Sequence, residues 1–256
     1  GVNGSGKHNN WSMSTDTGLN LLDPGSTPAE NGQFMLFLTA VIKAVDEYPD
    51  LLRLSVASAG NDHRLGGNEA PPAIVSIFVG EELGEIIDSL VRGVQYKGRK
   101  KGVMKLGVDT FPELPKDTTD RNRTSPFAFT GNKFEFRMLG STFSIAGPNI
   151  MINTIVADSL RQFADELEGA KDFNAALHDL VTRELKAHKR IIFNGNNYAP
   201  EWAEEAEKRG LPNLRTCADA LPHFADKKNI ELFERNRVFT EREVRARMEI
   251  MLENYS

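Results

Sequence analysis

The chain has 256 residues, of which 40% are hydrophobic and 26% are charged, and a formal net charge of −5. These values are typical of a globular protein, and the acidic balance argues against a nucleic-acid partner. No apolar run approaches the roughly 20 residues of a membrane span, and the N-terminus lacks the order of a signal peptide, so we expect no membrane partner and a cytoplasmic location. The single Cys217 excludes an internal disulfide and a multi-cysteine metal site.

The N-terminal stretch GVNGSGKHNNWS combines a glycine turn with an extended segment. Strand alternation places His8, Asn10 and Ser12 on one face, and Asn9 and Trp11 on the other. A natural domain rarely starts inside such a motif, so we expect the chain to be cut from a longer protein. A lone histidine is more often a solvated residue than a metal ligand, and His8 stays open between the two at this point.

The next element is a predicted helix over 28–48, PAENGQFMLFLTAVIKAVDEY. Thr27 and Glu30 form the pattern of a capping box, and Pro28 stands at the first helical position. Pro49 stops the helix.

A glycine- and proline-bounded loop, AGNDHRLGGNEAPP at 59–72, precedes the apolar strand AIVSIFV. Arg64 in this loop can clamp a carboxylate with two parallel hydrogen bonds, and Glu69 can take a proton or screen a cationic intermediate. The competing interpretation is an exposed loop with opposite charges. The basic run YKGRKKGVMK at 96–105 has no aromatic stacking platform and is interpreted as a solvated loop.

A further loop, DRNRTSPFAFTG at 120–131, brings Arg121 and Arg123 next to the following strand. Cations beside a metal site suit phosphoryl transfer, because its transition state spreads negative charge over several oxygens.

The strand NKFEFRM, residues 132–138, alternates charged and apolar side chains. The charged face holds Lys133, Glu135 and Arg137, and the apolar face holds Phe134, Phe136 and Met138. A solvated outer face of an antiparallel sheet and a functional face both explain this pattern when the strand is taken alone.

From residue 148 onward the pattern is helical. Amphipathic helices are predicted over 148–169 and 172–191, and a third over 240–255, where Thr240 and Glu243 form a capping box. Short strands and long loops before 147 and helices after it predict an α+β protein.

The motifs NGSGKH, HRLGGNEAPP, NRTSP and KFEFR stand in the order found in the catalytic half of glutamine synthetases. The chain resembles the large type III branch over essentially its whole length, with the motifs confined to residues 2–141. The resemblance implies a glutamine synthetase and guanidino kinase-like fold, in which a curved antiparallel sheet carries ions and substrates on its concave face. Residues 1–147 would then be the C-terminal part of the catalytic domain, and 148–256 its mainly helical end and C-terminal extension.

The resemblance also implies a divalent cation, Mg²⁺ or Mn²⁺, beside the phosphates of ATP. His8 and Glu135 match two ligands of this metal. Lys133 stands where the family usually has an arginine near the nucleotide phosphates, and Ser12 stands where a nucleotide-contacting serine is expected.

For the substrate glutamate, Arg137 and Arg64 match the residues that bind a carboxylate. Asn3 and Gly4 match the loop that receives the amino-acid end. Lys at position 133 keeps the charge of an arginine and loses its fork geometry, so nucleotide contacts there are expected to differ.

Two residues match catalytic positions. Arg123 corresponds to the arginine that stabilises the transferred phosphoryl group, which also contacts the nucleotide. Glu69 corresponds to the flap glutamate that closes over the intermediate and helps deprotonate ammonium. Asn10 and Ala128 depart from the family pattern, at positions where many members have a histidine and a phosphate-binding arginine.

The implied partners are glutamate, ammonia and ATP, joined into glutamine through γ-glutamyl phosphate, in a double-ring homo-oligomer that is a dodecamer in the longer parent. The family's remaining metal glutamates lie upstream of the NGSG turn, and part of each site comes from a neighbouring subunit. We therefore expect the isolated chain to be inactive. Two alternatives stay open: a γ-glutamyl ligase for a larger amine, and a non-catalytic module that retains the fold.

Overall fold

The structure of the chain is a computed structural model that describes residues 6–67, 69–98, 103–104, 114–115 and 122–255. Asn3, Gly4, Arg121 and much of the basic run at 96–105 lie outside the described residues. Among the described residues, no helix has both the length and the apolar character of a membrane span.

The sheet that carries the predicted site has four strands in the order β1-β6-β5-β2. Their bounds are Gly6–Trp11 for β1, Phe134–Gly140 for β6, Phe127–Phe129 for β5 and Ile77–Phe78 for β2. The pairs β1–β6 and β5–β6 are antiparallel, as expected, whereas β2 runs parallel to β5, so the sheet is mixed. A separate antiparallel pair is formed by β3, Val103–Met104, and β4, Leu114–Pro115.

The register of the sheet confirms the predicted faces of β1 and β6. Asn10 pairs with Glu135, which pairs with Ala128 on the next strand, so these three side chains share one face. A bulge opposite His8 interrupts the β1–β6 register between Lys7 and Asn9. The two residues that depart from the family pattern therefore flank Glu135 directly.

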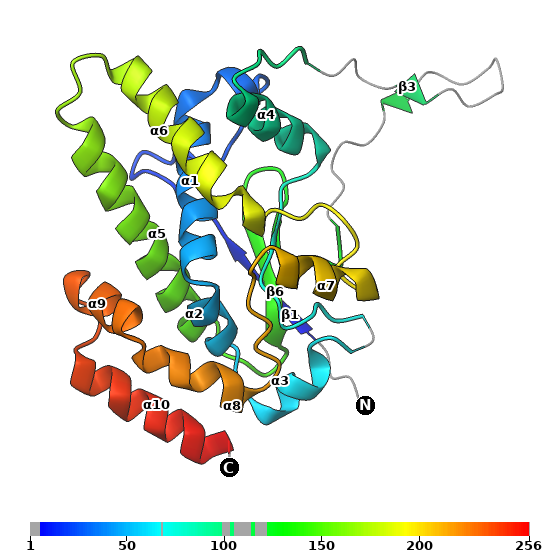
Figure 1. Cartoon of the computed structure of the whole chain (residues 1–256), viewed down its shortest axis with the longest axis vertical. Helices are drawn as coiled ribbons and strands as arrows, with labels where there is room; N and C mark the ends of the chain where they lie inside the picture. The colour runs from blue at the N-terminus through cyan, green and yellow to red at the C-terminus, as the bar shows by residue number, and fades with distance from the viewer. Residues whose placement is uncertain (1–5, 68, 99–102, 105–113, 116–121, 256) are drawn as a thin grey trace.

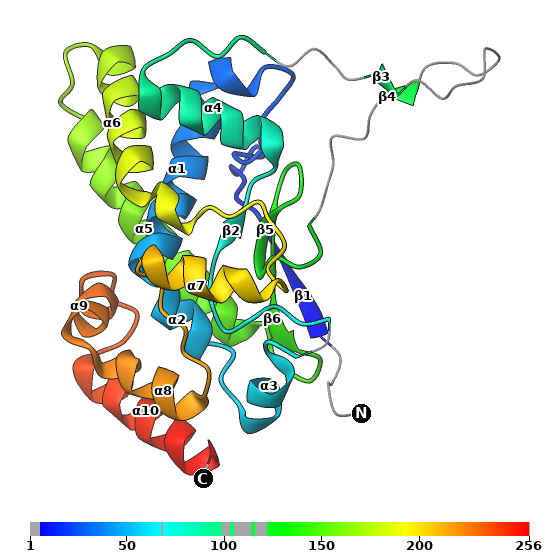
Figure 2. The same ribbon diagram turned by 45° about the vertical axis from the view of Figure 1, so that its right-hand side comes forward.

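The other face of the sheet is apolar and packs against helices. Phe134 and Phe136 are fully buried, and the ring of Phe127 stacks on Phe134 with centroids 4.9 Å apart. Trp11 donates through Nε1 to Asn153 Oδ1, 2.8 Å away on α5, Ala146–Leu167. Each buried phenylalanine contributes about 1.5–3 kcal/mol of burial free energy, which holds the polar face in place from behind. Figure 2 shows the strands on one side of the body and α1, α5 and α6 on the other.

The helix α1, Gly32–Glu47, begins later than predicted. Thr27 makes no side-chain cap, and Pro28–Glu30 forms a short 3₁₀ helix, η1, so the predicted capping box is wrong. Asn31 caps α1 instead, because its Oδ1 accepts from Phe34 N at 3.0 Å. Pro49 begins α2, Pro49–Leu54, directly after Tyr48.

The loop predicted at 59–72 contains a helix, α3, Ala59–Arg64, capped by Ser58. Because this segment is rich in glycine and proline, its sequence did not predict the short helix. The remaining helices before the C-terminal part are α4, Glu81–Arg92, and α6, Phe173–His188. The predictions over 148–169 and 172–191 are confirmed by α5 and α6.

The C-terminal part of the chain is helical, as expected. Its elements are η2 Lys189–Ile191, α7 Pro200–Lys208, α8 Cys217–Ala220, η3 Leu221–Ala225, α9 Lys227–Arg235 and α10 Glu241–Tyr255. The capping box at the start of α10 is confirmed: Thr240 N donates to Glu243 Oε2 at 2.8 Å, and Glu243 N donates to Thr240 Oγ1 at 3.3 Å. Figure 1 shows α8, α9 and α10 grouped beside the lower end of α5.

A buried carboxylate fixes α9 against α5. Asp158 is 1% exposed and accepts from Nε and Nη2 of Arg235, each at 2.8 Å, and from Asn236 Nδ2 at 2.9 Å. Burial alone would raise the pKa of Asp158, but the hydrogen bonds from Arg235 and Asn236 hold it well below its usual range. The ion pair therefore stabilises the fold above the unfolded pKa of about 3.9, and that stabilisation is lost as the pH falls through the folded pKa.

We expect Arg235→Met to lower the free energy of unfolding by about 2–3 kcal/mol at pH 7, because it leaves a buried carboxylate without its main partner, although Arg235 is partly exposed. The matched control is Arg245→Met, which removes an exposed pair with Glu241 worth less than about 0.5 kcal/mol. Urea unfolding of the three proteins gives both differences. The Arg235→Met difference should shrink as the pH falls below ~4, because Asp158 of the unfolded chain takes up a proton there while the paired carboxylate of the folded protein stays charged. A difference that is constant with pH would contradict this assignment.

Candidate active site

Three predicted site residues meet at the polar face of the sheet, where His8 and Arg137 both lie close to one carboxylate oxygen of Glu135. His8 Nδ1 lies 3.4 Å from Glu135 Oε2, and Nε and Nη2 of Arg137 donate to the same oxygen at 3.2 and 3.1 Å. Glu135 is 7% exposed and Arg137 is 3% exposed. The face is therefore a buried, charge-paired surface, and the interpretation of a solvated outer face is wrong for Glu135 and Arg137.

His8 is the accessible member of this group, with 56% of its side chain exposed. Burial lowers the pKa of His8, and the positive charge of Arg137 lowers it further against the opposing effect of Glu135. The imidazole is therefore neutral at pH 7, which is the form that ligates a metal.

An imidazole nitrogen and a carboxylate oxygen 3.4 Å apart fit two corners of a divalent cation site. The donor set suits Mn²⁺, which accepts both imidazole and carboxylate, and Mg²⁺ would rely on Glu135 and water. Two protein donors leave most of an octahedral shell open. These residues would therefore supply only part of such a metal site.

Arg64 reaches the same strand from α3, but its guanidinium contacts backbone atoms. Nη1 donates to Met138 O at 3.1 Å, and Nη2 donates to Arg137 O at 3.2 Å. Arg64 is 6% exposed and also packs on Gly6, where an added Cβ would lie 2.1 Å from Nη2. The structure thus brings Arg64 to Arg137, with part of its five-donor fork used to hold β6.

Glu69 and Arg123 lie on exposed segments beside this group. Glu69 has a φ of 57°, and Asn122, next to Arg123, has a φ of 31°. Such values are strained for residues other than glycine and are often found at functional loops. The carbonyl of Asn122 accepts from Arg137 Nη1 at 2.5 Å. This bond fixes the residue before Arg123 against the polar face.

Lys133 and Ser12 lie at the other end of β6 and β1. Ser12 Oγ donates to Asn132 O at 3.1 Å, and Asn20 Nδ2 donates to the same carbonyl at 2.9 Å. Lys133 precedes β6 and lies outside the strand. The prediction that three charged residues share one face of a single strand is therefore confirmed only for Glu135 and Arg137. Ser12 and Lys133 thus lie at one end of β6, and Arg137 and Arg64 at the other, with Glu135 between them.

Two residues of this neighbourhood were missed by the sequence analysis. Asn122 donates through Nδ2 to Gly195 O at 2.7 Å and to Asn194 O at 3.3 Å. The loop that receives these bonds carries Tyr198, whose pKa is raised by burial and by Glu69 and lowered by Arg64 and Arg137. The only sequence signal was the turn-forming run NGNNY, which does not reveal a contact with residue 122.

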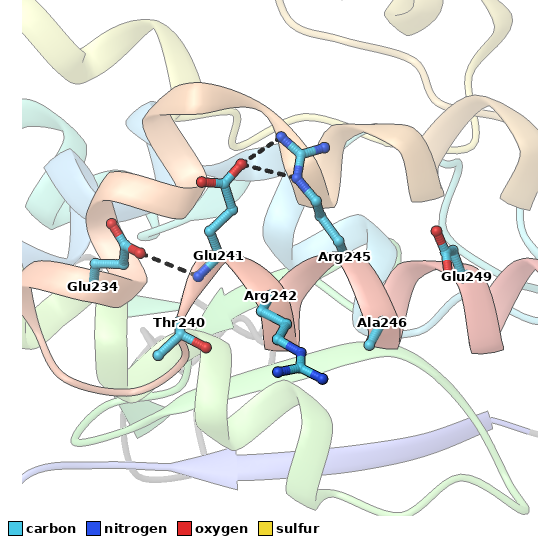
Figure 3. Close-up of a pocket in the computed structure, with 7 residues that line it drawn as sticks. All are labelled: Glu234, Thr240, Glu241, Arg242, Arg245, Ala246 and Glu249. Atoms are coloured by element: carbon cyan, nitrogen blue, oxygen red, sulfur yellow. Dashed lines mark hydrogen bonds and ion pairs between the residues drawn. The ribbon is translucent and has the colours of Figure 1, made fainter.

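A hollow on the outer side of α10 lies apart from these residues (Figure 3). It is lined by Glu234, Thr240, Glu241, Arg242, Arg245, Ala246 and Glu249. Arg245 pairs with Glu241 one turn away, at 2.6 Å, as exposed helix pairs commonly do. This hollow has the character of a solvated helix face.

The remaining cysteine is structural, as expected. Cys217 is fully buried, and its Sγ lies 3.2 Å from Asp62 Oδ1, which also accepts from Arg53 Nη2 at 2.7 Å. Burial, together with Asp62, raises the pKa of Cys217 to about 12. The thiol is therefore protonated and unreactive at neutral pH.

Comparison with known proteins gives matches that extend over the whole of this chain. The chain is 51% identical to "Type-3 glutamine synthetase" of Dictyostelium discoideum and covers 35% of it, and it is 53% identical to a glutamine synthetase of Butyrivibrio fibrisolvens and covers 37% of it. A glutamine synthetase of Bacteroides fragilis is 46% identical, with 36% covered. The glutamine synthetase C-terminal domain family matches residues 176–256. The chain thus spans about a third of the length of the curated relatives that it matches.

We expect Gly6→Ala to lower the free energy of unfolding by about 1–3 kcal/mol, because the new methyl group displaces the buried Arg64 guanidinium from β6. Gly60→Ala is the control, since nothing lies within 4 Å of its Cβ position in α3, and alanine favours a helix. Thermal unfolding of both variants measures the difference. Equal stability of the two variants would show that Arg64 is not held as described.

Proposed function

We propose that this chain, which belongs to the glutamine synthetase family, supplies part of a site that ligates glutamate and ammonia to glutamine at the expense of ATP. The observation that carries the proposal is the convergence of His8 and Arg137 on Glu135 Oε2. This convergence supports the proposal, because a histidine and a carboxylate that can ligate a metal lie next to an arginine, which can bind a carboxylate. A reaction between a nucleotide phosphate and a carboxylate needs these two functions side by side.

The reaction would proceed in two steps. The γ-carboxylate oxygen of glutamate attacks the γ-phosphorus of ATP, the bond to ADP breaks, and γ-glutamyl phosphate forms. Ammonia then attacks the acyl carbon, and inorganic phosphate leaves to give glutamine. Splitting the ligation in this way converts a poor leaving group, hydroxide, into a good one, phosphate.

The residues at the Arg137 end of β6 would bind and orient glutamate. The Arg137 guanidinium is held by Asn122 O and Glu135 and would present its positive charge to the acid, and Arg64 adds positive charge from α3. Arg123, exposed on the neighbouring turn, would approach the transferred phosphoryl group and balance its charge. Glu69, on its strained loop, would accept a proton from ammonium and exclude water that hydrolyses the acyl phosphate.

A second set of residues, which runs from Lys133 and Ser12 to Glu135 and His8, would face the nucleotide. His8 and Glu135 would hold a divalent cation, Mg²⁺ or Mn²⁺, which when bound neutralises the phosphates of ATP. Lys133 and Ser12 would contact phosphate or ribose oxygens of the nucleotide. Asn10 and Ala128 flank Glu135 without charge, so nucleotide contacts here rely on fewer cations than in relatives with arginine at the second position.

We further propose that the chain acts as part of a longer polypeptide in a homo-oligomer. Two metal donors fall short of the six to eight oxygen ligands, or the octahedral set, that hard cations take. The chain also spans only about a third of its relatives. The missing carboxylates would come from residues beyond this chain and from a neighbouring subunit.

The test compares glutamine formation by the complete protein with that of its Glu135→Gln variant, at saturating glutamate, ammonium, ATP and Mg²⁺ or Mn²⁺. We expect Glu135→Gln to lower kcat at least about a hundredfold, on the scale of losing one transition-state charge contact. The control Glu241→Gln, on the exposed face of α10, should keep full activity. The isolated chain should form no glutamine.

A phosphate-release assay with different amines can contradict the proposal. If the complete protein releases phosphate with larger amines and not with ammonium, the acceptor is wrong and the amine ligase is correct. If neither amine nor ammonium drives ATP cleavage, the chain belongs to a non-catalytic relative.

A further inference from the structure

A loop from the C-terminal half of the chain is fixed against the candidate site. It spans residues 194–199, between η2 and α7, and is tied down at several points. Asn197 is 2% exposed; its backbone N donates to Thr124 Oγ1 at 2.9 Å, and its Oδ1 accepts from Ser76 Oγ at 2.9 Å. These bonds hold the loop beside the turn that carries Arg123.

Asn122 couples this loop to the substrate arginine. Its side chain donates to Gly195 O at 2.7 Å, while its carbonyl accepts from Arg137 Nη1 at 2.5 Å. Asn122 adopts a φ of 31°, which the surrounding hydrogen bonds must maintain. The loop and Arg137 are therefore positioned by the same residue.

Tyr198 is the side chain that this loop presents. Its backbone N donates to Asn196 Oδ1 at 2.9 Å, and 40% of the residue remains exposed. It lies close enough to Glu69, Arg64 and Arg137 for all three charges to act on its phenol group. An amphipathic ring is thus carried on a loop that bonds to Asn122 beside Arg137, within electrostatic range of Arg64 and Glu69.

We propose that Tyr198 is a specificity-determining residue that contacts the substrate amino acid. The inference rests on the proposed function, because it takes glutamate as the acid bound by Arg64 and Arg137. The ring supplies an apolar wall for the methylene stem of a glutamate-sized acid. The phenol hydroxyl donates a hydrogen bond to the acid's carboxylate. This bond favours an acid whose chain length fits the space between the arginines and Glu69.

The experiment measures KM and kcat of the complete protein with Tyr198→Ala and Tyr198→Phe, varying glutamate, ATP and ammonium in turn. Tyr198→Ala should raise the KM for glutamate about tenfold, because a hydrogen bond to a charged group and an apolar contact are lost together. The KM for ATP should differ from the wild-type value by less than about twofold, because the proposal gives Tyr198 no contact with ATP. Tyr198→Phe restores the ring and should give a smaller rise.

The control is Phe173→Ala, which removes another exposed aromatic ring, 53% exposed, from the start of α6. Thermal midpoints of all variants show whether the loop stays folded. An unchanged KM for glutamate in Tyr198→Ala, in a wild-type protein that makes glutamine, overturns the inference and leaves the proposed function intact. A parallel rise in all KM values with a lower midpoint assigns Tyr198 a structural role and also overturns it. A wild-type protein that makes no glutamine overturns both.

Discussion

The candidate site depends on the contacts made by one carboxylate oxygen. Glu135 Oε2 faces Arg137 at 3.1 Å and His8 at 3.4 Å, in a place where the glutamate is almost fully buried. A buried carboxylate is tolerated only when it is paired, and Arg137 is the partner that Glu135 has here. Since Arg137 also contacts Asn122, the same pairing sets the turn that carries Arg123. The proposed metal ligand Glu135 and the proposed substrate-binding residue Arg137 are thus coupled on one face of a single strand.

The rest of the chain holds this strand in position from behind and from the side. Behind it, the buried phenylalanines of β5 and β6 pack towards α1, where Phe34 lies 5.8 Å from Phe129 between ring centroids. From the side, the loop at 194–199 bonds to Asn122 and Thr124. This loop lies within the region matched by the glutamine synthetase C-terminal domain. The helical part of the chain therefore reaches the site directly, and is more than an appended extension.

Periodicity predicted the elements in which apolar side chains recur on one face. The two faces of β1 and β6 and the helices α5, α6 and α10 could be found because their apolar spacing is regular and local caps such as Thr240 mark an end. The start of α1 could not be found, because Thr27 and Asn31 are both acceptable caps and only the tertiary position of Phe34 decides between them. The hydrogen bonds of Arg64 to the β6 carbonyls, and those of Asn122 to residues 194 and 195, join distant segments and leave no local pattern.

The central claim, that His8 and Glu135 form a preformed half of a metal site, is tested most directly by titrating Mn²⁺ into this chain by calorimetry. The account predicts weak binding of Mn²⁺ to the wild-type chain, loss of binding in Glu135→Gln, and unchanged binding in Glu241→Gln, which alters a remote exposed carboxylate. Circular dichroism of each variant confirms that the fold is intact. Binding that persists in Glu135→Gln, or a wild-type chain that binds no Mn²⁺, would contradict the claim.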